Sequence, residues 1–128
     1  MKKVIAILVF VLAFSFNAQA QDDMMKKEVK TVALEQTKGV FTQEEVTLSA
    51  GDYVFEITNN YAGTDVGFVL VPEGKDASNA ENHIKAAYVT QVVKEGATEK
   101  SNVVSLSKGT YRYFCPLNKT PQYTLKVK

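Results

Sequence analysis

Cys115 and His83 are the side chains best suited to soft-metal or nucleophilic chemistry, and each is the only residue of its type. A thiolate binds copper or zinc and attacks electrophiles, and an imidazole binds the same metals or moves protons. A single cysteine excludes an internal disulfide framework and any multi-cysteine zinc or iron–sulfur site. A single histidine excludes a histidine-rich metal cage, and no recognisable hydrolase motif accompanies it. The sequence therefore predicts that the chain is not an enzyme.

The first 20 residues have the pattern of a secretory signal peptide. The positively charged start Met1–Lys3 precedes an unbroken apolar run, Val4–Phe14, and Ala18–Ala20 has the small-x-small form of a cleavage site. A helix of that apolar length rises about 16 Å, well short of the roughly 30 Å of a bilayer core, so an uncleaved anchor is the weaker alternative. The sequence predicts a signal peptide at residues 1–20, a periplasmic or extracellular protein, and no membrane contact after cleavage.

The length of the chain limits the number of its domains, and its charge limits the classes of partner. A chain of 128 residues has room for one domain with a single hydrophobic core. Its 15 basic and 14 acidic residues give a formal net charge of +1, and loss of Lys2 and Lys3 with the leader leaves 13 against 14, a net of −1. We expect no nucleic acid as a partner. An exported lone cysteine needs an explanation, because oxidising compartments favour disulfides.

Short strands separated by turn signals dominate the chain beyond residue 28. Residues 21–27 are polar and aperiodic, and we expect a disordered lead-in there. Tyr53–Thr58 alternates in the manner of a half-buried strand, and in Thr110–Cys115 two tyrosines share one face with Cys115. This pattern predicts an all-β sandwich of about seven strands. The expected strand segments are Val29–Leu34, Val40–Phe41, Val46–Leu48, Tyr53–Thr58, Val66–Val71, Val103–Leu106, Thr110–Cys115 and Tyr123–Val127.

One segment departs from the strand pattern. Small and apolar residues at three- and four-residue spacings predict a helix from Ala80 to Val93, with Ser78 or Asn79 as its N-cap. Pairs of β-branched residues toward its end weaken the helical pattern there. The helix would lie in a long connection between two strands.

Two segments of the chain resemble the cupredoxins, the family of blue-copper proteins. Val46–Asn59 contains a strand, an Ala-Gly-Asp turn and a second strand ending in Thr-Asn, as cupredoxins do. Lys108–Pro116 is similar to the family's Gly-x-Tyr-x-Tyr-x-Cys strand, which delivers the copper thiolate. The segments occur in the family's order, and the resemblance covers most of residues 28–128. It implies a cupredoxin-like Greek-key β-sandwich with one short helix in a long connection.

The resemblance also implies a type 1 copper site of two histidines, one cysteine and usually a weak axial methionine. Cys115 matches the family's cysteine. Residues 63–67, where the first histidine is expected, contain none, and Asn118 stands where the second histidine should follow the cysteine. No methionine follows, and Gln122 is the one plausible axial substitute. Three of the four implied ligands are therefore missing, and a standard blue-copper centre is not expected.

A degenerate metal site would combine Cys115 with Asn118, Asp65 and the distant His83, with Cys115 the best candidate. Amide and carboxylate oxygens are poor ligands for copper compared with imidazole and thiolate. A lone histidine on a predicted helix is more often a surface or capping residue than a ligand. The sequence therefore predicts either no cofactor or copper held by this nonstandard set.

Three functions follow from three interpretations of Cys115. If it is a buried small hydrophobe, the chain is an exported non-enzymatic binding or structural domain, with an unidentified protein or small-molecule partner. If it is a metal thiolate, the chain is a copper protein for electron transfer or copper handling with nonstandard ligands. If it is an exposed thiol, the chain binds a partner, or a second copy in a thiol-linked dimer, through Cys115.

Overall fold

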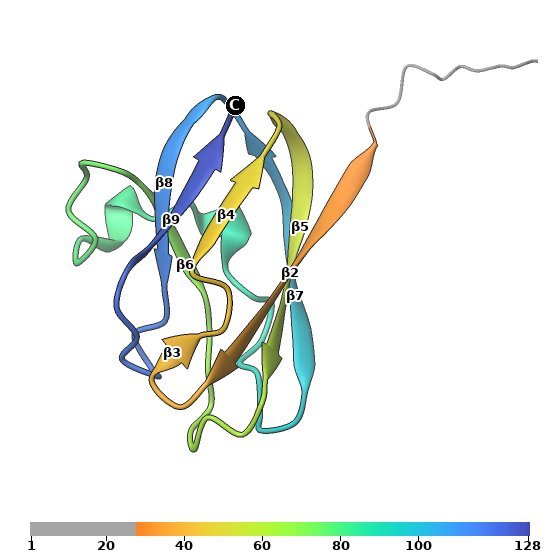
Figure 1. The fold of residues 1–128 in the computed structure, drawn as a ribbon, viewed down its shortest axis with the longest axis vertical. Helices are drawn as coiled ribbons and strands as arrows, with labels where there is room; N and C mark the ends of the chain where they lie inside the picture. The colour runs from red at the N-terminus through yellow and green to blue at the C-terminus, as the bar shows by residue number, and fades with distance from the viewer. Residues whose placement is uncertain (1–27) are drawn as a thin grey trace, which may run out of the picture.

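The computed structural model describes residues 28–128, which form two four-stranded β-sheets packed face to face (Figure 1). The predicted signal peptide, residues 1–20, and the predicted lead-in, residues 21–27, lie outside the described residues. In chain order the described elements are β2 (Val29–Thr37), β3 (Val40–Phe41), β4 (Glu45–Leu48), β5 (Gly51–Asn59), β6 (Val69–Pro72), the 3-10 helices η3 (Ala80–Asn82) and η4 (Lys85–Ala87), β7 (Thr98–Leu106), β8 (Gly109–Phe114) and β9 (Tyr123–Val127).

The chain crosses repeatedly between the two sheets. The first sheet has the order β3-β2-β5-β7, with β2 parallel to β5 and β7 antiparallel to β5. The second has the order β4-β9-β8-β6, with β4 parallel to β9 and the other neighbours antiparallel. Each sheet thus joins strands that are distant in sequence, which is the Greek-key arrangement of a β-sandwich. The predicted all-β fold class is confirmed.

Alternation along the strands decides which side chains enter the core. In β5 every second residue from Tyr53 to Asn59 is buried, and the residues between them are half-buried. In β8 Tyr111 and Tyr113 are buried, and Cys115, directly after the strand, continues the same face. This period of two is the one predicted from the sequence. It is what carries Cys115 into the interior.

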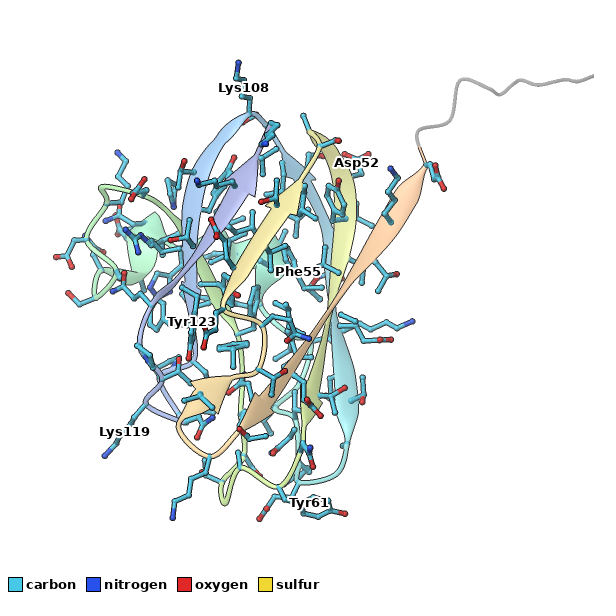
Figure 2. All side chains as sticks on the ribbon, in the orientation of Figure 1. Asp52, Phe55, Tyr61, Lys108, Lys119 and Tyr123 are labelled. Carbon is cyan, nitrogen blue, oxygen red and sulfur yellow. The ribbon has the colours of Figure 1, made fainter. Side chains whose placement is uncertain are left out.

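Aromatic rings from both sheets meet in the middle of the sandwich. Phe55 lies near the centre of the molecule (Figure 2), and its ring centroid is 4.8 Å from that of Phe68. Phe41 meets Tyr113 edge-on with centroids 5.1 Å apart. All four side chains are almost completely buried. Such edge-on and tilted pairs contribute about 0.5–1.5 kcal/mol each beyond the area they bury.

The helix predicted from Ala80 to Val93 is wrong. The segment contains only the single turns η3 and η4, and the rest is extended or irregular. Asn79 does cap the first of these turns, because its side-chain oxygen accepts the N–H of Glu81 at 3.0 Å. The long connection between β6 and β7 therefore holds two short 3-10 helices.

Pairing with strands explains why the second half of this segment is not helical. Val93 exchanges main-chain hydrogen bonds of 2.9 and 3.0 Å with Val66, and Val89 forms a bridge with Ser101 of β7. β-branched residues lose side-chain freedom in a helix and fit an extended backbone well. Extended pairing therefore satisfies the main-chain groups that a helix would have used internally.

Four labelled side chains identify the two ends of the sandwich. Asp52 and Lys108 lie at one end, and Tyr61 and Lys119 lie at the opposite end (Figure 2). β8 runs from the first end toward the second, so Cys115 lies at the end that carries Lys119 (Figure 1).

No helix within residues 28–128 has the length and apolar character that a membrane crossing requires.

Candidate functional site at the Cys115 end

The Cys115 side chain is buried away from solvent and hydrogen-bonded to two loops. Its exposed fraction is 0%, and its thiol is free. The sulfur accepts the main-chain N–H of Gly67, with N···Sγ 3.2 Å, and that of Asn118, with N···Sγ 3.4 Å. Gly67 precedes β6 and Asn118 follows β8, so the sulfur joins two loops that are distant in sequence.

The loop after Cys115 closes on itself by main-chain and hydroxyl hydrogen bonds. The N–H of Cys115 donates to Oγ1 of Thr120 at 2.9 Å, and the N–H of Thr120 donates back to the carbonyl of Cys115 at 3.2 Å. Lys119 makes the turn with φ of 53°, a left-handed value that is uncommon for a residue with a side chain. These bonds hold the loop over the sulfur.

The side-chain amide of Asn118 is hydrogen-bonded to other groups of the protein. The Nδ2 group donates to Oε1 of Gln36 at 3.0 Å and to the carbonyl of Thr37 at 2.8 Å. The Oδ1 atom accepts the N–H of Gly39, in the β2–β3 turn, at 2.8 Å. The side chain is buried, so these three bonds satisfy it without water. Asn118 therefore lies beside Cys115 as an anchor for the β2–β3 turn.

Gln36 completes the network and was not identified from the sequence. It is fully buried in β2, and its Nε2 donates to the carbonyl of Gly67 at 2.8 Å. The Gln36–Asn118 amide pair thus ties together the same two loops that bond to the Cys115 sulfur. The signal for Gln36 was its place in the alternation, two residues after the inward-facing Leu34.

Asp65 lies at the surface near this end of the sandwich. Its side chain is 45% exposed, and a carboxylate oxygen lies 3.7 Å from Nζ of Lys94. An exposed pair of this kind contributes little to stability. Asp65 therefore has a solvated lysine as its partner.

His83 lies on the outer side of β8, away from the Cys115 sulfur. Its ring packs edge-on against Phe114, with centroids 6.2 Å apart, and Phe114 faces the opposite way from Cys115 along the strand. Nε2 donates to the carbonyl of Ala77 at 2.7 Å, and Nδ1 forms a hydrogen bond of 2.6 Å with the hydroxyl of Tyr88. Both ring nitrogens therefore brace the connection that carries η3 and η4.

The whole of this architecture corresponds to a known family. A family model described as a cupredoxin-like domain matches residues 4–127. The chain belongs to the cupredoxin-like family. This agrees with the resemblance carried by the segment that ends at Cys115.

Three solved structures share the fold of this cupredoxin-like chain. Auracyanin A of Chloroflexus aurantiacus, described as a "blue" copper protein, has 20% identity and a TM-score of 0.66, covering 79% of this chain and 100% of its own. Auracyanin B has 21% identity and a TM-score of 0.63, covering 77% and 88%. The auracyanin of Roseiflexus castenholzii has 15% identity and a TM-score of 0.60, covering 77% and 96%. A search of curated protein sequences gives no match.

The residues of the cupredoxin-like chain do not fit a type 1 copper ion. Within residues 28–128 no three His, Cys, Asp or Glu side chains lie close enough to hold a metal ion. The N–H of Asn118 reaches the Cys115 sulfur, but the Asn118 side-chain amide is hydrogen-bonded to Gln36, Thr37 and Gly39. The Asp65 carboxylate lies beside Lys94, and the His83 ring packs against Phe114. Gln122, the one axial substitute, is exposed. A thiolate without imidazole neighbours is a poor copper site.

The Cys115 thiol is expected to react slowly in the folded protein. Because the sulfur is buried beneath the 116–120 loop, a reagent must wait for local opening of that loop. We expect modification at least about 100-fold slower than in a peptide spanning residues 110–120, measured with a chromogenic aromatic disulfide. Reaction at the peptide's rate would instead support the exposed-thiol interpretation. A thiol-linked dimer stays a prediction that requires this opening.

Proposed function

We propose that the chain is an exported, non-enzymatic cupredoxin-like protein that binds a partner or serves a structural role without a blue-copper centre. The observation that carries this proposal is the Gln36–Asn118 amide pair. It occupies the loops beside Cys115 with hydrogen bonds of 2.8–3.0 Å, where a copper protein needs free donor atoms. The partner is a protein or a small molecule.

Export is supported by the pattern of the first 20 residues, and it places the chain in the periplasm or outside the cell. A non-enzymatic role is supported by the chemistry of the two most reactive side chains. Cys115 is buried under a closed loop, and both ring nitrogens of His83 have partners within the fold. Neither group is poised for nucleophilic or acid–base work on a substrate.

Copper loading tests the proposal directly. The purified protein is incubated with Cu(II), and separately with Cu(I), and excess metal is removed by dialysis before metal analysis. We expect less than about 0.1 equivalent of copper to be retained and no intense visible thiolate-to-copper band, because no imidazole accompanies the sulfur. Retention of one equivalent that is lost in Cys115→Ser would overturn the proposal and favour electron transfer or copper handling.

A second variant distinguishes copper bound at the Cys115 end from copper bound by the N-terminal segment. Met24 and Met25 offer soft thioether donors outside the described residues. Copper that is retained by Cys115→Ser but lost in Met24→Leu/Met25→Leu belongs to that segment, and the proposal for the Cys115 end then stands. Copper that survives the methionine changes and disappears with Cys115→Ser contradicts it.

A further inference from the structure

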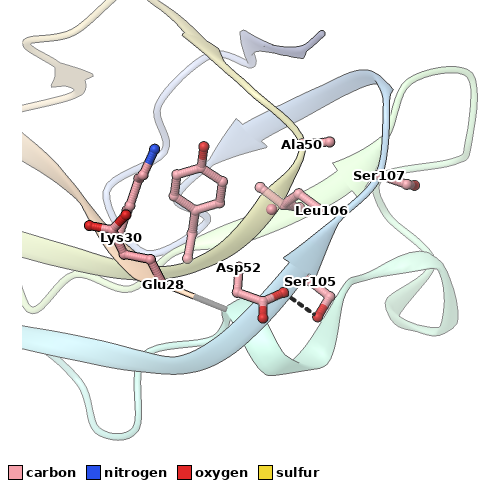
Figure 3. A pocket seen from close by; sticks show the side chains of 9 residues that line it. Glu28, Lys30, Ala50, Asp52, Ser105, Leu106 and Ser107 are labelled. Atoms are coloured by element: carbon pink, nitrogen blue, oxygen red, sulfur yellow. Dashed lines mark hydrogen bonds between the residues drawn. The ribbon is translucent and has the colours of Figure 1, made fainter. Parts of the chain in front are cut away.

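A groove of about 540 Å³ lies at the end of the sandwich opposite Cys115, beside the starts of β2 and β5 and the end of β7 (Figure 3). Glu28 and Lys30 line one side of it, and Leu106 and Ser107 line the other. Hollows of this size hold small molecules in many proteins. The groove is therefore large enough for a small ligand, and it lies away from the loops around the Cys115 sulfur.

Gly51 keeps the floor of this groove open. It begins β5 and pairs with Leu106 of β7. A Cβ atom at Gly51 would meet only the ring of Tyr53 within 4 Å, at 3.9 Å, and the backbone of Gly51 is not left-handed. The backbone conformation therefore does not require glycine here, and a side chain would project into the space beside Tyr53. Glycine in a strand often marks a place where a ligand approaches closely.

Two exposed side chains of opposite charge share one wall of the groove. Lys30 pairs with Tyr53 in the register of β2 and β5, and Glu28, two residues earlier, lies on the same side of the chain. In the described part of the chain, no ion pair of 4.0 Å or less includes either side chain. Asp52 also lines the groove, but its carboxylate accepts the hydroxyl of Ser105 at 2.8 Å. Glu28 and Lys30 thus offer a ligand one carboxylate and one ammonium group.

We propose that this groove binds a free amino acid with an aliphatic side chain. The ammonium group of the ligand lies against the Glu28 carboxylate, and its carboxylate lies against the Lys30 ammonium group. Its side chain lies over Tyr53 and Leu106 on the floor of the groove. This inference rests on the proposed function in that it names the small-molecule partner, and it uses no residue of the Cys115 end.

The charges and the floor of the groove favour this class of ligand over others. A simple anion is repelled by Glu28 and a simple cation by Lys30, whereas a zwitterion is attracted to both. Tyr53 and Leu106 are only 5% and 3% exposed, so they form a narrow apolar floor. Such a floor suits a short aliphatic chain, and it offers no open aromatic face on which a flat ring could stack.

Titration with L-leucine tests the proposal, followed by two-dimensional amide NMR of protein purified from cells expressing the full chain. We expect the amide signals of Gly51 and Leu106 to shift at millimolar leucine, since a small ligand in an open groove binds weakly. The signals of Gly67 and Asn118, at the Cys115 end, should stay in place. Isocaproate lacks the ammonium group of leucine, and isoamylamine lacks its carboxylate. Each should bind about 3–5-fold more weakly than leucine, because each loses one exposed charge pair.

Charge-removal variants assign each contact to its residue. In Lys30→Gln leucine should bind no better than isoamylamine, and in Glu28→Gln no better than isocaproate, because the matching contact is already absent. Gly51→Leu should keep the fold and give no response to leucine, because its side chain fills the groove. Lys75→Gln, at an exposed position between β6 and η3, should bind leucine as the original chain does.

Three results would overturn the proposal. They are leucine shifting no signal of the groove, both analogues binding as tightly as leucine, and a folded Gly51→Leu that binds leucine normally. The amide spectra show whether each variant is folded, and the two charge variants decide the question if Gly51→Leu is not. Copper loading stays a separate test, because copper held by Cys115 would contradict the proposed function without changing leucine binding at the opposite end.

Discussion

Replacing Asn118 with alanine is expected to lower the free energy of unfolding by about 3 kcal/mol, measured by denaturant unfolding at neutral pH. The change removes three hydrogen bonds of 2.8–3.0 Å and leaves Oε1 of Gln36 buried without a donor. An unsatisfied buried polar group costs about 1–3 kcal/mol, and the β2–β3 turn loses its anchor in addition. The effect is large because the side chain joins segments about 80 residues apart.

Asn60→Ala is the matched control for this prediction. Asn60 is exposed and makes one side-chain bond, from Nδ2 to Oε2 of Glu35 at 3.0 Å. Its loss should change the free energy of unfolding by no more than about 0.5 kcal/mol. Gln36→Ala should couple strongly to Asn118→Ala, with an interaction energy of about 1 kcal/mol or more. Equal, small effects for Asn118 and Asn60 would show that the amide pair is not a structural tie.

The alternation of side chains made the fold predictable from the sequence. Turn residues and period-two patterns located β5, β8 and β9, and they placed Cys115 on the inward face of its strand. The strand ends were less accurate. β2 and β5 continue through Gln36 and Asn59, which are buried polar residues at inward positions. The predicted strands stopped at Leu34 and Thr58, because local patterning does not extend a strand to a polar residue at an inward position, whereas these two amide side chains are satisfied by distant loops.

Asn59 shows why such residues escape a local analysis. Its Nδ2 donates to the carbonyls of Thr64 and Val93, and its Oδ1 accepts the N–H of Ala62. The carbonyl of Val93 comes from the connection in which the sequence predicted a helix. A buried amide at an inward position is stable only if such partners exist. The sequence contains the amide but does not reveal the loop that approaches it.

The candidate site was predictable in part for the same reason. The resemblance to the cupredoxins singled out Asn118, three residues after Cys115, and the N–H of Asn118 donates to the Cys115 sulfur. It could not reveal that Gln36, 82 residues earlier, takes the Asn118 amide. Nor could it show that His83 packs on the outer side of β8 against Phe114. Those contacts depend on how the sheets and the long connection are stacked.

Alkaline pH is expected to destabilise the protein through Tyr113. Its hydroxyl donates to the carbonyl of Gln43 at 2.6 Å, and its side chain is fully buried. Burial, with smaller contributions from Tyr123, Glu44 and Glu45, raises the pKa of Tyr113 to about 12 from 10.0. Above pH 10 the unfolded chain loses this proton while the folded chain keeps it, so stability falls with rising pH. The loss from this residue should reach about 2–3 kcal/mol by pH 12.

Tyr113→Phe should therefore be less stable than the original chain at neutral pH and more stable than it at high pH. At pH 7 the variant loses the bond to the Gln43 carbonyl and should be less stable by about 1 kcal/mol. It has no phenol to ionise, so it escapes the alkaline loss, and the two unfolding curves should cross near about pH 11. Denaturant unfolding at several pH values from 7 to 12 measures this, and titration of the other groups cancels in the difference. Tyr61→Phe, at a side chain that is 72% exposed, should stay parallel to the original chain throughout. Parallel curves for Tyr113→Phe as well would mean that the Tyr113 phenol ionises as readily in the folded chain as in the unfolded one.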